Sequence, residues 1–294
     1  MNRLLYILIY IPAFLTALLP FRILFLISDF FSFLLFYLFR YRRKLVHINL
    51  TNSFPNKTPE EIKKIEKDFY RHFCDYFFET IKLLNISESQ IKKHIIIRDK
   101  ESFQRLIDKK QPIVLLLGHY FNWEWIPSLA LQVNLDEDTV FGQVYRPLKN
   151  KTVDRFFLNL RKRFRTVNLT KHNVFRDIVN LRKDNKNWII GFMSDQKPSG
   201  NQIPHVMQFL NQETPVLTGT EKIARHTGAA VCYFDITHIK RGYYEVDTPI
   251  LFDNAAETSE FEITEKYIQY LEKTIHRNPS CYLWTHNRWR IKRK

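Results

Sequence analysis

The sequence predicts an α/β domain, with a mixed and largely parallel sheet flanked by helices, behind an apolar N-terminal segment that anchors it to a membrane. Short apolar runs with the length of buried strands alternate with amphipathic helical segments. A continuous apolar stretch occupies positions 4–39. Hydrophobic residues make up 45% of the 294-residue chain, which is enough for a large core and excludes a disordered or fibrous protein.

The apolar stretch from Leu4 to Phe39 contains only two charged residues, Arg22 and Asp29. A bilayer-spanning helix needs about 20 mostly apolar residues, so the stretch suffices for one span, or for one span plus an interfacial helix broken near Pro20. It is too long for a cleaved signal peptide, and no small-residue cleavage site follows it. Four cations lie within positions 40–44, so the positive-inside rule predicts an anchor at 1–40 and a cytoplasmic domain at 41–294.

The domain begins with helices. Thr58, Pro59 and Glu61 supply an N-cap, a first-turn proline and a capping-box glutamate, and the apolar period predicts a long helix that ends near Leu84. A short helix is expected at 101–110. The run Pro-Ile-Val-Leu-Leu-Leu at 112–117 then reads as a buried strand that ends at Gly118.

The same alternation continues downstream. Strands are predicted near 139–145, 187–194, 229–239 and 242–248, and helices near 150–165, 216–227 and 259–277. In sheets of this kind, chemistry resides in the loops that follow the strands. No glycine-rich phosphate loop is present, so chemistry driven by nucleotides is not expected.

The net charge and the cysteine content restrict the kind of partner and the redox compartment of the protein. With 45 Lys and Arg against 30 Asp and Glu, the net charge of +15 implies an anionic partner: a nucleic acid, an anionic membrane or an acidic protein. The three cysteines form no CxxC pair, so the sequence predicts neither a disulfide framework nor a thiolate zinc site, and a reducing compartment fits best. We expect no metal ion.

His119 and Glu124 are the candidate catalytic pair. His119 directly follows the strand that ends at Gly118, and Asn122 is a suitable N-cap for a helix beginning near Trp123. A glutamate in the first turn of that helix could accept a hydrogen bond from the loop histidine and fix its tautomer, leaving the other ring nitrogen to act as a base. A first-turn glutamate that merely complements the helix dipole is the structural alternative.

Charged residues also follow the next strands. Arg146 comes after the strand at 139–145, and Asp195 after the strand at 187–194. The loops that carry them are expected to meet His119 in one cleft, where an arginine could bind a phosphate or neutralise an oxyanion. A surface arginine and a loop-capping aspartate are the alternatives.

The motifs together resemble the late acyltransferases of lipid A biosynthesis, the lauroyl and myristoyl transferases related to the glycerolipid acyltransferases. The similarity covers essentially the whole chain and is carried by YRRKLVHINLTNSFPNKTPEEIKKIEKDFYRHFCD, GHYFNWEW, VYRPLKNKTVDRFF, MSDQKP, TPVLTGTEKIARHTGAAV and YLWTHNRWR. The resemblance implies a glycerolipid acyltransferase-like fold. It further implies transfer of a fatty acyl chain from acyl carrier protein to a hydroxyl of a lipid A precursor, without a cofactor, at the cytoplasmic face of the inner membrane.

By position, the resemblance assigns His119 as catalytic histidine, Glu124 as its acidic partner, and Arg146 and Asp195 as substrate-binding residues. Family members often carry Phe-Phe-Gly after the third motif, whereas this chain has Gln208-Phe209-Leu210-Asn211, which leaves the acceptor open.

Two basic runs are expected to contact the acidic carrier protein, the phosphates of the acceptor, or anionic inner-membrane lipids. One is the predicted helix near 150–165, with Arg161 and Arg163 as the test positions, and the other is the C-terminus at 287–294. Two alternatives remain: an acyltransferase for another membrane lipid, and a membrane-tethered basic binding module. No nucleic-acid partner is expected, because no RNA-binding, zinc-finger or helix-turn-helix pattern is present.

Overall fold

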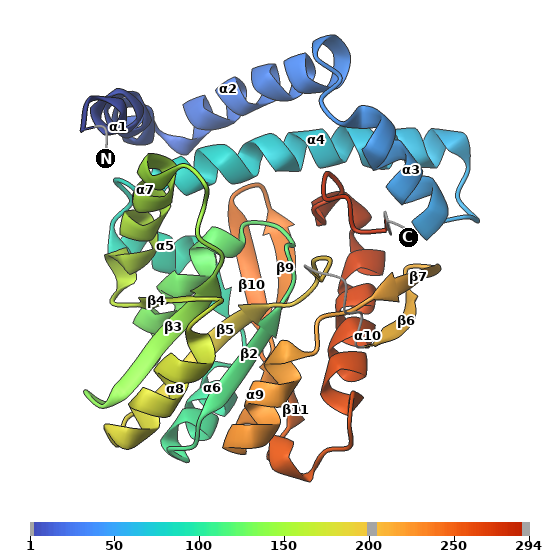
Figure 1. Cartoon of the computed structure of the whole chain (residues 1–294). Helices are drawn as coiled ribbons and strands as arrows, with labels where there is room; N and C mark the ends of the chain where they lie inside the picture. The colour runs from blue at the N-terminus through green and yellow to red at the C-terminus, as the bar shows by residue number, and fades with distance from the viewer. Residues whose placement is uncertain (1–2, 199–204, 290–294) are drawn as a thin grey trace.

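A six-stranded sheet with the strand order β11-β8-β2-β5-β3-β4 forms the centre of the computed structural model, which describes residues 3–198 and 205–289 (Figure 1). Every neighbouring pair is parallel except β11 and β8. The predicted mixed and largely parallel sheet is therefore confirmed. In chain order its strands are β2 (Ile113–Leu117), β3 (Thr139–Tyr145), β4 (Val167–Thr170), β5 (Asn187–Met193), β8 (Ala230–Tyr233) and β11 (Ile250–Phe252).

The middle of this sheet is buried on both faces. All five residues of β2 are buried, between β5 on one side and β8 on the other. A strand covered on both faces can carry apolar side chains at every position, which explains the uninterrupted run Ile-Val-Leu-Leu-Leu. The strands predicted at 112–117, 139–145 and 187–194 thus form.

The predicted strand at 229–239 is divided between two sheets. Its first part, β8, belongs to the central sheet, whereas β9 (Asp235–Lys240) pairs with β10 (Tyr243–Asp247) in a three-stranded sheet completed by β1 (Ile95–Ile97). The change falls at Phe234, whose N–H still donates to Leu116 O in the central sheet. A further hairpin, β6 (Val206–Phe209) and β7 (Gln212–Pro215), turns through Leu210 and Asn211, both with positive φ.

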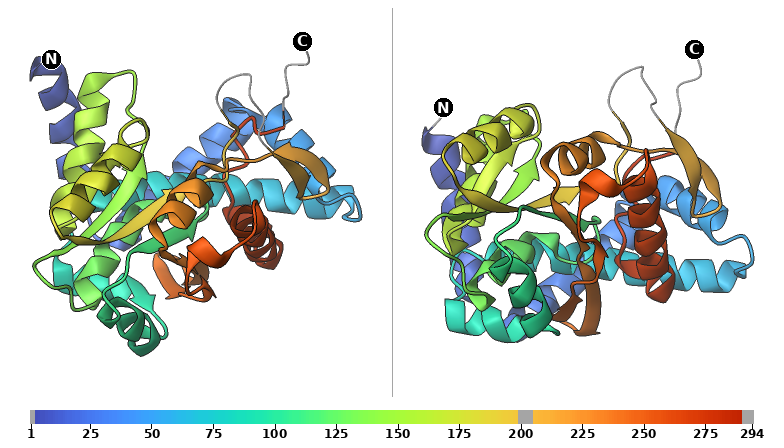
Figure 2. Two further views of the ribbon diagram at one scale, coloured as in Figure 1. Left: turned by 60° about the horizontal axis from the view of Figure 1, so that its bottom comes forward. Right: turned by 90° about the horizontal axis from the view of Figure 1, so that it is seen from below.

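Helices flank the sheet. Figure 1 shows α8 and α9 in front of it, and Figure 2 shows α7 and α8 on one side of the molecule and α10 on the other. Their bounds are α3 (Arg43–Ser53), α4 (Pro59–Lys82), α5 (Glu88–His94), α6 (Lys100–Asp108), α7 (Lys151–Arg161), α8 (Val174–Lys183), α9 (Gly219–Thr227) and α10 (Glu262–Arg277). Single-turn 3₁₀ segments are η3 (Lys162–Phe164), η4 (Ala255–Glu257) and η5 (Pro279–Cys281).

Helix α4 begins where the capping box predicts. The Glu61 N–H donates to Thr58 Oγ1 at 3.3 Å, and the Thr58 N–H donates to Glu61 Oε2 at 2.8 Å. The helix passes over the edge of the sheet at which the parallel strands end, and it separates that edge from the N-terminal segment (Figure 1). It therefore supplies residues to the loops that follow the strands.

The N-terminal segment forms α1 (Arg3–Leu18), α2 (Phe21–Phe33) and a π-helical turn, η1 (Leu34–Leu38), which we call the N-terminal helical layer. Pro20 breaks the segment as predicted. Residues 21–38 are long and apolar enough to cross a membrane, with a mean hydropathy of 1.9 over 18 residues. The expected N-terminal apolar helix, which could anchor the chain to a membrane, is thus present.

Several elements were not predicted: α3, α5, α8, β1, β4, β6, β7 and β11. The missed strands have only three or four residues, and β4 is half-exposed with no apolar run. Such short segments are specified by the partners they pair with more than by their own composition.

Candidate active site

His119 lies in the loop between β2 and the 3₁₀ helix η2 (Trp123–Gln132). Gly118 starts this loop in close contact with α10, because a Cβ there would lie 2.4 Å from Leu271 Cδ1 and would force that side chain to move. Phe121 adopts a left-handed conformation with φ of 52°. The loop is therefore held in one sharp conformation at the end of the buried strand.

The carboxylate that contacts His119 is Asp195. His119 Nδ1 lies 2.7 Å from Asp195 Oδ1, and the His119 backbone N–H donates to Asp195 Oδ2 at 3.1 Å. Asp195 follows β5, the parallel neighbour of β2, so the two residues meet at the edge where both strands end. The Asp195 side chain is 1% exposed and that of His119 is 14% exposed, which leaves only the histidine accessible from outside.

The surroundings keep Asp195 ionised. Burial alone raises the pKa of this carboxyl, but the charge and hydrogen bonds of His119, together with the charge of Arg288, outweigh burial and lower the pKa to about 2. An ionised Asp195 accepts a hydrogen bond from the Nδ1–H of His119, which leaves Nε2 with a free lone pair. Gln196 Nε2 lies 3.1 Å from His119 Nε2 and occupies the position of a hydrogen-bond donor to that lone pair.

Glu124 does not accept the expected hydrogen bond from His119. Its carboxylate forms a bidentate pair with Arg161, with Oε1 2.5 Å from Nη2 and Oε2 2.7 Å from Nε. The Tyr76 hydroxyl donates to the same carboxylate at 3.4 Å. The imidazole faces β5 while Glu124 faces α7 and α4, so the predicted pairing of His119 with Glu124 was wrong in its geometry.

Asn122 also differs from its predicted role. Its side chain makes no cap bond to η2, and Nδ2 instead donates to Glu79 Oε2 at 3.0 Å. The Tyr244 hydroxyl lies 2.8 Å from the same oxygen, and Trp125 Nε1 donates to the Glu79 backbone carbonyl at 3.0 Å. Burial, reinforced by the charge of Asp75, raises the pKa of Glu79 to about 8, so α4 supports the loop that carries His119 with a protonated carboxyl group.

The C-terminal segment closes over the loop from the other side. The Phe121 N–H donates to Cys281 O at 2.9 Å, and the Leu283 N–H donates to His119 O at 3.1 Å. Arg288 follows in this segment with 1% exposure, and among the described residues none of its side-chain nitrogens has a hydrogen-bond partner. Its guanidinium group lies 5.0 Å from the centroid of the Phe209 ring and contributes positive charge near Asp195.

Arg146 follows β3 directly and is exposed. In the sheet order, β5 lies between β3 and β2, so Arg146 belongs to the same edge as His119 but not to its immediate neighbours. The structure thus brings Asp195 to His119 and leaves Arg146 at the periphery of the site.

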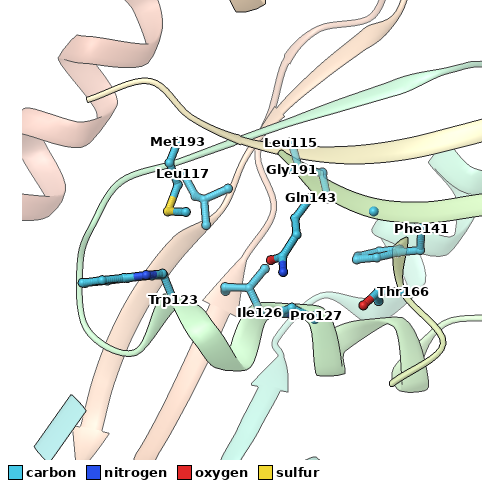
Figure 3. A pocket seen from close by; sticks show the side chains of 11 residues that line it. Leu115, Leu117, Trp123, Ile126, Pro127, Phe141, Gln143, Thr166, Gly191 and Met193 are labelled. Carbon is cyan, nitrogen blue, oxygen red and sulfur yellow. The ribbon is translucent and has the colours of Figure 1, made fainter. Parts of the chain in front are cut away.

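An apolar pocket opens beside the histidine (Figure 3). The Trp123 ring packs edge-on against His119, with ring centroids 5.0 Å apart, and forms one end of the pocket. Gln143 and Thr166 at the other end direct their polar groups to Asn168 and to the Arg161 carbonyl. The cavity itself is narrow, about 20 Å³, which is room for roughly one water molecule. Its lining comes from β2, β3, β5, η2 and the loop before β4: Leu115, Leu117, Trp123, Ile126, Pro127, Phe141, Gly142, Gln143, Thr166, Gly191 and Met193.

The basic face predicted near 150–165 is smaller than expected. Arg161 forms an ion pair with Glu124, and Arg163 donates to the carbonyls of Leu83 and Ile86. Neither side chain is therefore available to bind an acidic partner. Exposed cations on this face include Lys151, Lys162 and Arg165. Of the predicted C-terminal basic run, residues 290–294 lie outside the described residues.

No group of three or more His, Cys, Asp or Glu side chains that could hold a metal ion occurs within residues 3–198 and 205–289. The arrangement is suited to proton transfer: an accessible imidazole nitrogen, a buried carboxylate behind it, and an apolar cavity beside it. No role was predicted from the sequence for Gln196, Glu79 or Arg288. Gln196 could have been noticed, since it adjoins Asp195 in the MSDQKP motif, but no sequence signal identifies Glu79.

Comparison with known proteins identifies the family to which the chain belongs. Residues 2–291 match a family model described as bacterial lipid A biosynthesis acyltransferase. None of the curated proteins compared with the chain matches it. The family match includes the β2–η2 loop, the end of β5 and the C-terminal segment through Arg288. The chain therefore belongs to the bacterial lipid A biosynthesis acyltransferase family.

Proposed function

We propose that this acyltransferase moves a fatty acyl chain from the thioester of acyl carrier protein to a hydroxyl of a lipid A precursor, at the cytoplasmic face of the inner membrane. The observation that carries the proposal is the His119–Asp195 pair beside an apolar pocket. A base next to an apolar pocket, which has to widen to admit a hydrocarbon chain, suits acyl transfer to an alcohol. His119 is the catalytic residue, and Asp195 is a positioning residue.

The reaction is a direct displacement. His119 Nε2 takes the proton from the acceptor hydroxyl as the oxygen attacks the thioester carbonyl, and the imidazolium that forms is stabilised by Asp195. The tetrahedral intermediate then expels the carrier thiolate, which receives the proton from Nε2. The ester bond forms, the thioester bond breaks, and no acyl-enzyme or cofactor is needed. In the free protein Gln196 occupies the hydrogen-bonding position at Nε2 that the acceptor hydroxyl would take.

The pocket beside Trp123 is the proposed site of the acyl chain. The Gln143 amide nitrogen and the Thr166 hydroxyl are hydrogen-bonded to the protein, and most of the other lining residues are apolar. A hydrocarbon chain there places its carbonyl end near His119. The exposed Arg146 at the same sheet edge is proposed to contact an anionic group of the substrate.

The proposed donor is supported by charge. Acyl carrier proteins are acidic, and the exposed Lys151, Lys162 and Arg165 lie on the α7–η3 face. A positive face of this kind accelerates encounter with an acidic partner. Glu124 and Arg161 form a buried pair next to this face and are proposed to fix the orientation of α7 relative to the catalytic loop.

A reconstituted assay tests the function. Purified protein receives acyl carrier thioesters of several chain lengths and a tetra-acylated lipid A precursor, with His172→Ala, a change at an exposed histidine, as the matched control. We expect His119→Ala to reduce turnover by about 10² to 10⁴ and the control to retain it. Equal turnover by His119→Ala and wild type would refute the proposed base.

The acceptor is tested separately. Mass spectrometry of total lipids after deletion of the gene should show lipid A that lacks one acyl chain. Intact lipid A together with a change in another membrane lipid would instead assign the same chemistry to a different acceptor.

A further inference from the structure

We propose that α1 and α2 lie flat in one leaflet of the bilayer, with one apolar face in the lipid, and that neither helix crosses the membrane. The inference concerns the N-terminal helical layer and is independent of the proposed reaction. By length and composition alone, residues 21–38 could span. The contacts of the layer with the rest of the chain favour the flat arrangement.

The inner side of α2 carries charges that are paired with the domain. Asp29 Oδ1 lies 2.8 Å from Arg241 Nη2, and the same guanidinium group contacts Asp75 of α4 at 2.6 Å. Ser28 donates to Asp75 at 2.6 Å, and Arg71 of α4 adds a contact to Asp29 at 3.2 Å. A carboxylate in the middle of a spanning helix would be costly in lipid, whereas here it is bound by two arginines of the domain.

Contacts between α2 and the domain extend along its whole length. At its start, the Phe21 ring lies 4.4 Å from the His94 ring. In its middle, Phe25 packs so closely on Gly242 that a Cβ at that glycine would come within 2.9 Å of the ring. Beyond its end, Phe36 of η1 lies 5.5 Å from Tyr70 of α4. A helix that touches a water-soluble domain at both ends cannot also cross the bilayer.

Both ends of α1 are also tied to the domain. Lys82 Nζ, at the end of α4, donates to the carbonyls of Ala17 and Leu19 at 2.8 Å each. Near the other end, Asn159 of α7 donates to the Tyr6 hydroxyl at 3.1 Å. The 16 residues of α1 extend about 24 Å, less than the hydrocarbon thickness of a bilayer.

The outer side of the layer is apolar and exposed. Its large exposed side chains, at 41% to 66% exposure, include Leu4, Leu8, Ile11, Leu15, Ile23, Leu26, Phe30, Phe33 and Leu38, and the exposed Phe39 follows the layer directly. Exposed Arg22, Arg40 and Lys44 flank this surface. Figure 1 shows α2 as the outermost layer, on the opposite side of α4 from the sheet. Apolar side chains bordered by cations match the interface of an anionic leaflet, which identifies the bilayer as the occupant.

Depth measurements distinguish the two arrangements in the full-length protein. Nitroxide labels on cysteines introduced one at a time at Ile23 and Phe33 report depth in vesicles of phosphatidylethanolamine and phosphatidylglycerol. The native cysteines are buried, so the label reports the introduced site. If α2 crosses, these positions ten residues apart differ in depth by about 15 Å, whereas a flat helix gives a difference below one turn, about 5 Å. The larger difference would overturn the proposal.

A second measurement tests the side on which the N-terminus lies. Tags at the N- and C-termini are exposed to protease in sealed inside-out membrane vesicles. We expect both tags to be cut, since a flat layer leaves both ends on the domain side. Protection of the N-terminal tag alone would show a single span and refute the inference.

The polar contacts are tested with Arg241→Gln, using Arg176→Gln at an exposed position as control. We expect amide exchange over residues 21–33 to become at least tenfold faster in the Arg241 variant and to stay unchanged in the control, because Asp29 and Asp75 lose their shared counter-charge. Unchanged exchange in both variants would contradict the role given to Arg241 in holding α2 flat.

Discussion

The Asp195→Asn variant tests whether His119 depends on Asp195, its partner in the structure, or on Glu124, the partner expected from the sequence. Asp195 accepts two N–H groups of His119, from the backbone at 3.1 Å and from Nδ1 at 2.7 Å. An asparagine has one acceptor oxygen and one amide donor group. If its oxygen keeps the backbone N–H, the amide group faces Nδ1 and forces the ring proton onto Nε2, where the lone pair for the substrate is needed.

The expected loss follows from removing the base. General base catalysis contributes about 10² to 10⁴ in rate, which is roughly 3–5 kcal/mol of transition-state stabilisation. We therefore expect Asp195→Asn to lower kcat by that factor in the carrier-thioester assay. The KM should change little, because Asp195 is 1% exposed and lies behind the histidine.

Glu124→Gln is the matched comparison. Glu124 contacts Arg161 and Tyr76, not His119, so kcat should remain within a few-fold of wild type at a temperature at which the variant is folded. The free energy of unfolding should fall by roughly 1–3 kcal/mol, since the buried Arg161 loses its charged acceptor. The reasoning fails if Glu124→Gln is as slow as His119→Ala while Asp195→Asn keeps its activity.

Three further changes test the surroundings of the site. Gly191→Ala adds a methyl group to the pocket at 3.6 Å from Leu117 Cδ2, an ordinary contact, so the longest acyl chain accepted should lose preference over a shorter one by roughly tenfold in a competition assay. Charge reversal at Lys162 and Arg165 should raise the KM for carrier thioesters at low salt but not for coenzyme A thioesters; equal effects on both donors would exclude a carrier dock there. Burial raises the pKa of Glu79 from 4.5 to about 8, so the unfolded chain loses this proton first as pH rises. The free energy of unfolding of the wild type should therefore fall between pH 4.5 and about pH 8, by at most about 1.4 kcal/mol per pH unit. Thermal unfolding curves of Glu79→Gln should show a flatter dependence on pH.

Local signals in the sequence were sufficient to predict many of the helices and strands. The capping box at Thr58, the proline break at Pro20 and the apolar run that becomes β2 each act within a few residues, so their effects on the backbone can be read without knowing the partners. The placement of His119 directly after a buried strand follows from the same run. The short strands β4 and β11 lack such signals because their pairing partners define them.

Tertiary structure alone decided which carboxylate meets His119. Glu124 is five residues away in sequence and Asp195 is 76 away, yet the parallel pairing of β2 with β5 brings the distant residue to 2.7 Å. Glu124 faces Arg161 instead, the last residue of α7, with which it forms an ion pair. Likewise, the apolar composition of positions 4–39 indicates contact with lipid, but only the structure shows that α2 is tied to the domain through Arg241, 212 positions beyond Asp29. Sequence determines what one segment can form, whereas the choice among distant partners is made by strand order and packing, which composition does not encode.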